Sequence, residues 1–597
     1  MKMSCRRAFD IHYSRSTVQL QVGDSLDIFW LGCAGLITAE ANPVPQRPRG
    51  FERHSAPFGR DFLQHPRASG WKCPDFIRRS VVVEVDDVVG ASHAHFSGRS
   101  GMRPPHGGVV RIAEAREKLA VGDAVGALAA LRSALEANPS REAQTLAARA
   151  LRRLDRHAEA AALLAAAFEQ HPDDPIIAHN LAAARGDAGD HAGAAVAARR
   201  AIQLRDAPES WLVLGRALQA AGDLADAQAA LADAVARRPG YIDALKTLAQ
   251  LIWMRTGDPG AALEPLHRAL LASPSPDLAA MTCGVMRDIS GPDEAYRFIQ
   301  PWTGRGSAAV ELAASAAAAR LDMASQNLHA EAAVALAPTL AEAQHALATG
   351  QLAQGRLEPA LEGLERWLAL APHDQIALGL QRTAWRLAGR PEALDASDYS
   401  RLVRVYDIET PPGFSTRAAW LDALATALRG LHSFRAEPFG QSVRAGAQSR
   451  TDPRWAGDPV IDATFAAFEA PLAAYVADMD ASDPMGARAG GARIAGAWSV
   501  KLTSGGRHSD HVHSRGWVSS AFYVAVPEPV SSDPRAGWLR FGAATLGPGV
   551  ELPPEHWVEP RPGRLALFPS WLWHGTEPFS GAGERLTIAF DAQPSGT

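Results

Sequence analysis

The stretch RHSDHVHSRGWVSSAFYVAVP, residues 507–527, holds a cluster of histidines that runs directly into alternating apolar residues. Alternation of this kind is typical of a half-buried β-strand. Side chains at positions i and i+2 of a strand point to the same face, so His511 and His513 are expected to reach one metal ion. Further short apolar runs, separated by Gly and Pro, occur from Ala495 onward. They favour an all-β sandwich or barrel in the C-terminal part.

A third ligand is expected from the segment PSWLWH, residues 569–574, which follows a predicted strand and ends in His574. Arg585 lies eleven residues further on and opens the apolar run RLTIAF. In a strand, Arg585 and Thr587 face the same side. The pattern therefore predicts a site with three imidazole ligands and a cation nearby.

These residues resemble a bacterial family of 2-oxoglutarate–Fe(II) oxygenases that is often fused to tetratricopeptide repeats. The similar stretches are HSDHVHSRGWVSSAFYVAVP, GRLALFPSWLWHGTEPF and QSVRAGAQS, within about residues 436–592. The resemblance implies a double-stranded β-helix (jelly-roll) domain. It also implies Fe(II) as the metal, with 2-oxoglutarate and O₂ as cosubstrates.

Carried over to this chain, the resemblance assigns roles to six residues. The metal ligands would be His511, His513 and His574. Arg585 would bind the distal carboxylate of 2-oxoglutarate with the help of Thr587. Tyr523 would be a further hydrogen-bond donor to the cosubstrate, although a buried aromatic of the core explains this residue equally well.

One position departs from the usual pattern, because most oxygenases of this fold carry Asp or Glu two residues after the first histidine. Here that position is His513, and a neutral imidazole gives the metal less charge than a carboxylate. In a second register, His508 and Asp510 would be the close pair. The register with His511 and His513 is favoured, since it lies nearer the following strand and agrees better with the family stretch.

Residues 106–395 are rich in Ala, Leu and Arg, and they resemble seven to eight tetratricopeptide repeats. Glycines that end a first helix recur at spacings near 33 to 35 residues or multiples of them, and prolines follow each second helix at the same spacing. The part from Ser290 to Ser325 is degenerate, because its Gly and Pro positions shift. Such arrays form a curved groove, and a protein or peptide partner is expected in it.

The sequence thus divides into three parts. Residues 1–105 are irregular, and we interpret them as a disordered extension or as a misplaced start, with Met102 as the true beginning. Residues 106–395 form an α-solenoid. Residues 396–597 form the oxygenase-like β domain with flanking helices, which gives an α + β multidomain protein.

The composition excludes several classes of protein. The 597 residues carry a net charge of only −5, which argues against a dedicated nucleic-acid binder. Four scattered cysteines exclude a disulfide framework or a structural zinc module as the organising device. No run of 18 apolar residues occurs, so no membrane contact is expected, and the cytoplasm is the expected location.

Three hypotheses for function follow. The first is an oxygenase that hydroxylates a protein or peptide side chain held by the repeats, or a small metabolite. The second is a non-catalytic adaptor, in which the repeats bind a partner and the β domain is degenerate. The third is a cupin-type metal protein with three histidines and no 2-oxoglutarate, which would have no need of Arg585.

Overall fold

The computed structural model describes residues 106–137, 139–393, 398–479, 491–527, 533–548 and 550–595. Helices occupy this part up to Leu387, and strands predominate after Arg404. All the described residues fall within one compact unit of the chain. The predicted extension at residues 1–105 lies outside the described residues.

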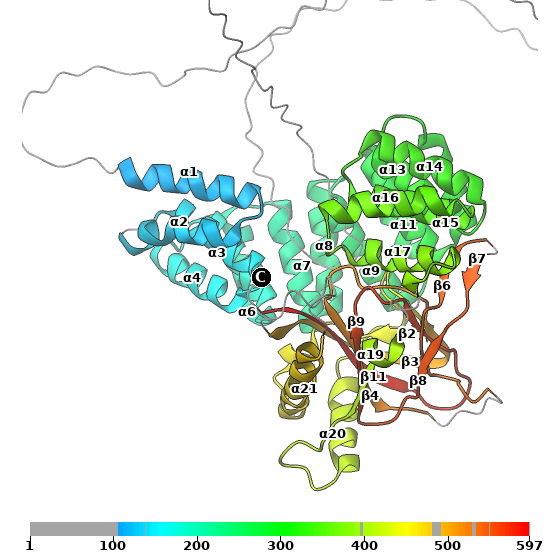
Figure 1. Cartoon of the computed structure of the whole chain (residues 1–597). Helices are drawn as coiled ribbons and strands as arrows, with labels where there is room; N and C mark the ends of the chain where they lie inside the picture. Colours follow the sequence, from blue (N-terminus) through cyan, green and yellow to red (C-terminus); the bar gives the residue numbers. More distant parts are fainter. Residues whose placement is uncertain are drawn as a thin grey trace, which may run out of the picture. The chain divides into compact units, whose positions relative to one another are not determined.

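The helices before Leu387 pack as consecutive pairs, which confirms the predicted helical repeats (Figure 1). Gly222 and Gly257 end two of the first helices with φ values of 98° and 69°. This left-handed backbone is accessible to glycine without strain and lets the chain turn into the second helix. The helices are α1 (His106–Ala120), α2 (Ala124–Ala137), α3 (Arg141–Arg153), α4 (His157–Gln170), α5 (Pro175–Asp187), α6 (His191–Leu204), α7 (Pro208–Ala221), α8 (Leu224–Arg237), α9 (Ile242–Thr256), α10 (Pro259–Ala272), α11 (Pro276–Ile289), α12 (Pro292–Ile299), α13 (Ala308–Ala318), α14 (Met323–Leu336), α15 (Ala341–Ala353), α16 (Leu357–Leu370) and α17 (Gln375–Leu387).

The degenerate repeat is held together by a buried polar network. Helix α12 is shortened to eight residues. In the neighbouring pair of helices, Nδ1 of His329 lies 2.7 Å from a carboxylate oxygen of Glu311, and the other oxygen accepts a hydrogen bond from the backbone of Gly304 at 2.6 Å. Glu311 is buried, so these bonds offset the cost of removing its charge from water.

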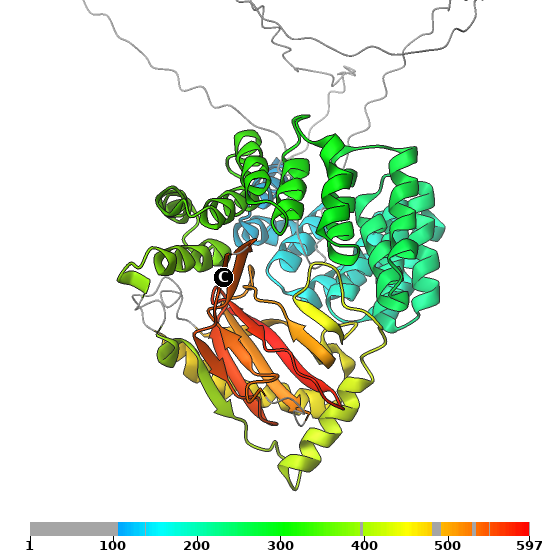
Figure 2. The same cartoon turned by 90° about the vertical axis from the view of Figure 1, so that its right-hand side faces the viewer.

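The C-terminal region is built from antiparallel strands (Figure 2). A six-stranded sheet has the order β1-β9-β4-β11-β3-β2, and two smaller sheets have the orders β10-β5-β8 and β6-β7. The jelly-roll arrangement stays a prediction. The strands are β1 (Arg404–Asp407), β2 (Val443–Gln448), β3 (Ala492–His508), β4 (Val518–Ala525), β5 (Leu539–Phe541), β6 (Ala544–Gly547), β7 (Val550–Leu552), β8 (His556–Val558), β9 (Arg564–Pro569), β10 (His574–Thr576) and β11 (Arg585–Pro594).

The two faces of the six-stranded sheet differ in what they contact. Two helices, α20 (Arg417–Arg429) and α21 (Pro459–Ala477), pack on one face. There the ring of Phe468 lies 4.9 Å from that of Phe522 and 5.5 Å from that of Phe590. Helix α21 is long and apolar enough to cross a membrane, but its apolar side chains pack on this sheet. The opposite face is left to line a cavity.

The segment between α20 and β2 lies against the helical repeats. The side chains of Phe434 and Phe439 are buried among apolar residues of the repeats. The indole nitrogen of Trp253, near the end of α9, donates a hydrogen bond to the backbone carbonyl of Glu437 at 2.8 Å. Part of the repeat surface is therefore covered by the chain's own C-terminal region.

Candidate metal centre

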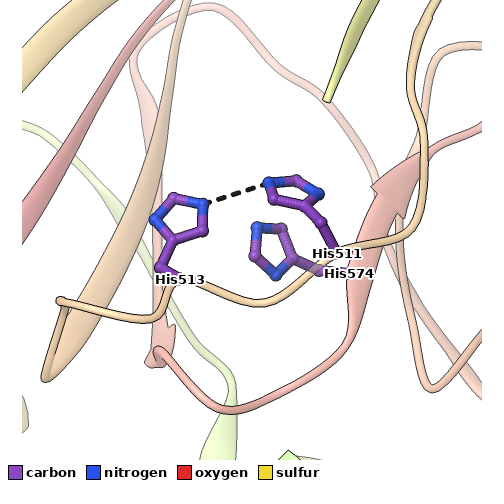
Figure 3. A group of neighbouring side chains, drawn as sticks. All are labelled: His511, His513 and His574. Carbon is purple, nitrogen blue, oxygen red and sulfur yellow. Dashed lines mark hydrogen bonds between the residues drawn. The ribbon is translucent and has the colours of Figure 1, made fainter. Parts of the chain in front are cut away.

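Three histidines converge in one place, as the sequence predicts for His511, His513 and His574 (Figure 3). One ring nitrogen from each lies within 4.8 Å of those from the other two. The chain brings them together through an isolated β-bridge, in which the backbones of His511 and His574 exchange two hydrogen bonds of 3.0 Å. The predicted strand placement is wrong in one respect. β3 ends at His508, and the close pair lies in the loop beyond it, where the bridge fixes its direction.

The hydrogen bonds of the three rings leave one nitrogen of each turned toward the others. Nδ1 of His511 and Nδ1 of His574 each donate to the backbone carbonyl two residues earlier, at 2.8 and 2.9 Å. Nδ1 of His513 lies 2.6 Å from a carboxylate oxygen of Asp591 and donates to it. These bonds assign the lone pair of each ring to Nε2. The Nε2 atoms of His511 and His513 are only 3.1 Å apart, an arrangement of facing acceptors that a cation between them stabilises.

Burial keeps the rings of His511 and His574 neutral. His574 is 5% exposed. Burial lowers the pKa of His511 to about 3 and that of His574 well below its ordinary value. Because only the unprotonated ring binds a metal, both side chains are ready to act as ligands at neutral pH.

Asp591 is a site residue that the sequence reasoning missed. It lies on β11, and the same carboxylate oxygen that binds His513 also accepts a hydrogen bond from the hydroxyl of Ser519 at 2.7 Å. Most oxygenases of this fold have a carboxylate two residues after the first histidine. Here Asp591 supplies a carboxylate that contacts the ring of His513 by a hydrogen bond and does not reach the metal position itself. The period of two along β11 could have revealed it, since Asp591 shares a strand face with Arg585 and Thr587.

Replacing Asp591 with asparagine is expected to weaken metal binding about 10- to 100-fold, because the amide neither charges nor orients the His513 ring as the carboxylate does. Isothermal titration of the apo-protein with Co(II) measures this change. The exposed Asp422 on α20 provides a matched control, and Asp422→Asn should bind the metal as the wild type does. Equal affinity in both variants would show that Asp591 has no part in the site.

A buried cation lies beside the histidines. Arg585 is 2% exposed, and among the described residues no carboxylate forms an ion pair with it. Its Nε atom has no hydrogen-bond partner there, and its guanidinium carbon lies 5.0 Å from the centre of the Tyr523 ring. Thr587 is also buried, with its hydroxyl 3.4 Å from the carbonyl of Val500. A buried charge without a counterion is costly, so this arrangement suits an anionic ligand.

The histidines and Arg585 line one cavity of about 350 Å³. Residues on the face of the six-stranded sheet opposite the helices line it, including Trp498 and Ala589. Residues 440–443 and Ile376 of α17 also line it. The cavity is large enough for a small dicarboxylate and one further organic group.

The second register, with His508 and Asp510 as the metal pair, is not what the structure brings together. The carboxylate of Asp510 forms two bonds with the guanidinium of Arg540, at 2.9 and 2.8 Å, and Arg540 also binds Glu577 at 3.0 Å. His508 lines the cavity and shares a hydrogen bond of 2.9 Å with the hydroxyl of Ser442. His508 is therefore a cavity residue beside the three converging histidines.

Comparisons with known proteins agree with a chain made of helical repeats followed by a C-terminal region of strands. A family model described as "Putative 2OG-Fe(II) oxygenase" matches residues 496–591, and a tetratricopeptide repeat model matches residues 141–184. The first match contains all three histidines, Arg585 and Asp591. The chain thus combines a region that matches this oxygenase family with tetratricopeptide repeats, as the sequence resemblance indicated.

Solved structures similar to the chain are helical repeat proteins. One is a tetratricopeptide repeat protein from Parabacteroides merdae, at 14% identity and a TM-score of 0.29, covering 40% of this chain and 97% of the other. Another is PilW, a type IV pilus biogenesis factor, at 19% identity and a TM-score of 0.29, covering 34% and 94%. A third is MamA, at 21% identity and a TM-score of 0.24, covering 26% and 92%. No curated protein matches the sequence.

Proposed function

We propose that the protein is an Fe(II)- and 2-oxoglutarate-dependent oxygenase that hydroxylates an organic substrate. One observation carries the proposal. Three imidazole lone pairs converge beside a buried arginine that has no carboxylate partner among the described residues. A metal ion would accept the three lone pairs, and an anion bound beside it would neutralise the charge of the arginine.

The donor set fits the metal. Neutral imidazoles suit Fe(II), and three protein ligands leave coordination positions open. His511, His513 and His574 would hold the ion, and Asp591 would hold the ring of His513. When bound, iron would supply the activation of O₂ that is coupled to the decarboxylation of 2-oxoglutarate.

The other side chains of the cavity would bind and orient the cosubstrate. Arg585 would receive a carboxylate of 2-oxoglutarate in a bidentate contact, with the hydroxyl of Thr587 beside it. The ring of Tyr523 would hold the guanidinium of Arg585 in place by a cation–π contact. Apolar side chains of the lining, such as Phe568 and Leu539, would keep bulk water from the reacting groups.

For the substrate, we propose a protein or peptide side chain, because tetratricopeptide repeats generally mediate contacts between proteins. The cavity has room for one side chain next to the cosubstrate. A small metabolite is a second candidate. It is favoured by the observation that Phe434 and Phe439 already cover part of the repeat surface. We propose the cytoplasm as the location, without nucleic acid or membrane as partners.

The adaptor hypothesis accounts less well for the site. A chain without ligands would keep an uncompensated buried cation and three facing acceptors, both of which cost folding free energy. The cupin-type hypothesis leaves Arg585 without a purpose.

Anaerobic titration of the apo-protein with Fe(II) and then 2-oxoglutarate tests the proposal. A chelated cosubstrate is expected to give a weak visible charge-transfer band, and succinate should form once O₂ is admitted. If Fe(II) binds but neither the band nor succinate appears in the folded protein, the oxygenase proposal fails and the cupin-type hypothesis takes its place. If the folded protein does not bind Fe(II), the adaptor hypothesis takes its place.

A further inference from the structure

We propose that α17, the last described helix of the repeats, is a positioning element of the metal centre and one wall of its cavity. The metal belongs to the proposed function, so this inference rests on it. The two segments that carry the histidines are residues 511–513 and 571–574, here called the ligand segments. Helix α17 lies directly against both.

The clearest contact is at Gly379, in the middle of α17. A Cβ atom added there would lie 2.7 Å from the backbone carbonyl oxygen of Trp571, 3.3 Å from a methyl group of Val512 and 3.5 Å from the indole nitrogen of Trp573. Val512 lies between two of the histidines, and Trp573 directly precedes the third. Glycine weakens the interior of a helix relative to alanine, so its presence here fits the need for close backbone approach.

Side chains on the same face of α17 fasten the helix to the site. The guanidinium of Arg382 lies over the ring of Trp571, with its carbon 3.5 Å from the ring centre. Arg386 donates hydrogen bonds to the carbonyls of Gly542 at 2.6 Å and Pro553 at 2.8 Å. The backbone nitrogen of Gly542 in turn donates to the carbonyl of Trp573 at 2.9 Å. The arginine thus reaches the second ligand segment through a single intervening residue.

The spacing along α17 shows that these contacts form a single face. Ile376, Gly379, Arg382 and Arg386 follow one another at intervals of three or four residues, which places them on one side of a helix. Ile376, at the start of this face, lines the cavity. The repeats and the C-terminal region therefore build the site together, and a substrate in the cavity would meet an apolar side chain from the repeats.

The test uses the full chain and Co(II), whose visible spectrum reports coordination without O₂ or cosubstrate. Gly379→Ala is expected to lower Co(II) affinity at least tenfold, because the added methyl group pushes both ligand segments outward. Gly284→Ala, in α11, is the matched control, since a Cβ there meets no atom within 4 Å. It should bind Co(II) as the wild type does, and both variants should keep the helical circular dichroism of the wild type.

A second variant covers the case in which Gly379→Ala does not fold. Arg386→Ala removes a fastening without adding an atom, and it should lower Co(II) affinity several-fold. Wild-type affinity in a folded Gly379→Ala, or in Arg386→Ala if the first does not fold, would overturn the inference. His574→Ala separates the two proposals. If it too binds Co(II) normally, the metal site itself is wrong, whereas loss in His574→Ala alone removes only the role of α17.

Discussion

His574→Ala is expected to abolish specific metal binding, with an affinity for Co(II) or Fe(II) lowered at least about 1000-fold. The side chain supplies one of three ligand atoms in a buried site, and its neighbours cannot replace it because their Nδ1 atoms are engaged in hydrogen bonds. Isothermal titration measures the loss. Removing the ring also relieves the crowding of unprotonated nitrogens, so the thermal midpoint of the apo-protein should fall by only a few degrees.

His556→Ala is the matched control for this variant. His556 is partly buried on β8 and stacks on the ring of Tyr399 at 5.3 Å, outside the three converging histidines. This variant should keep full metal affinity. Strong metal binding by His574→Ala would contradict the assignment of the ligands.

Arg585→Met is expected to raise the stability of the fold while it lowers the affinity for 2-oxoglutarate. Methionine fills most of the same volume without a charge, and removing an uncompensated buried cation should raise the free energy of unfolding by about 1–3 kcal/mol. Metal affinity should stay near that of the wild type. Affinity for 2-oxoglutarate should fall roughly 100-fold, which corresponds to about 3 kcal/mol for a lost charge-assisted pair of hydrogen bonds. Urea unfolding of the apo-protein and anaerobic titration of the Fe(II) form measure the two effects.

Arg540→Met is the matched control for stability. Arg540 has carboxylate partners in Asp510 and Glu577, so its loss leaves those two charges unpaired and should lower the free energy of unfolding by about 2 kcal/mol. The two arginines are thus expected to respond with opposite signs. A clear destabilisation in Arg585→Met would mean that this guanidinium is satisfied by the protein itself.

Local patterns were sufficient to predict the helical repeats and the grouping of three histidines. The recurring glycines predict the helical pairs because each helix end depends on a few neighbouring residues. The convergence of His511, His513 and His574 was predicted, although the strand on which the prediction placed the close pair ends at His508. Their local setting was not predicted, because the bridge between His511 and His574 joins segments 63 positions apart.

Contacts between distant segments account for what sequence reasoning could not supply. Asp591 reaches His513 across 78 positions, and the strand period places Asp591 on the face of Arg585 without showing which histidine it contacts. The pairing of Asp510 with Arg540, 30 positions further along the chain, was likewise not apparent from the sequence. No pattern within the repeats singles out Gly379, since the surface that requires it comes from another part of the chain.

The reciprocal backbone hydrogen bonds between His511 and His574 determine how the site is arranged when no metal is bound. They fix two of the three ligands by contacts that need no ion, so the geometry of the site is part of the folded chain rather than a product of binding. Metal would then add to stability only by mass action, in contrast to small domains that fold around their ion. If iron binds as proposed, its withdrawal would leave the bridge, and with it the placement of these two ligands, in place for the next ion.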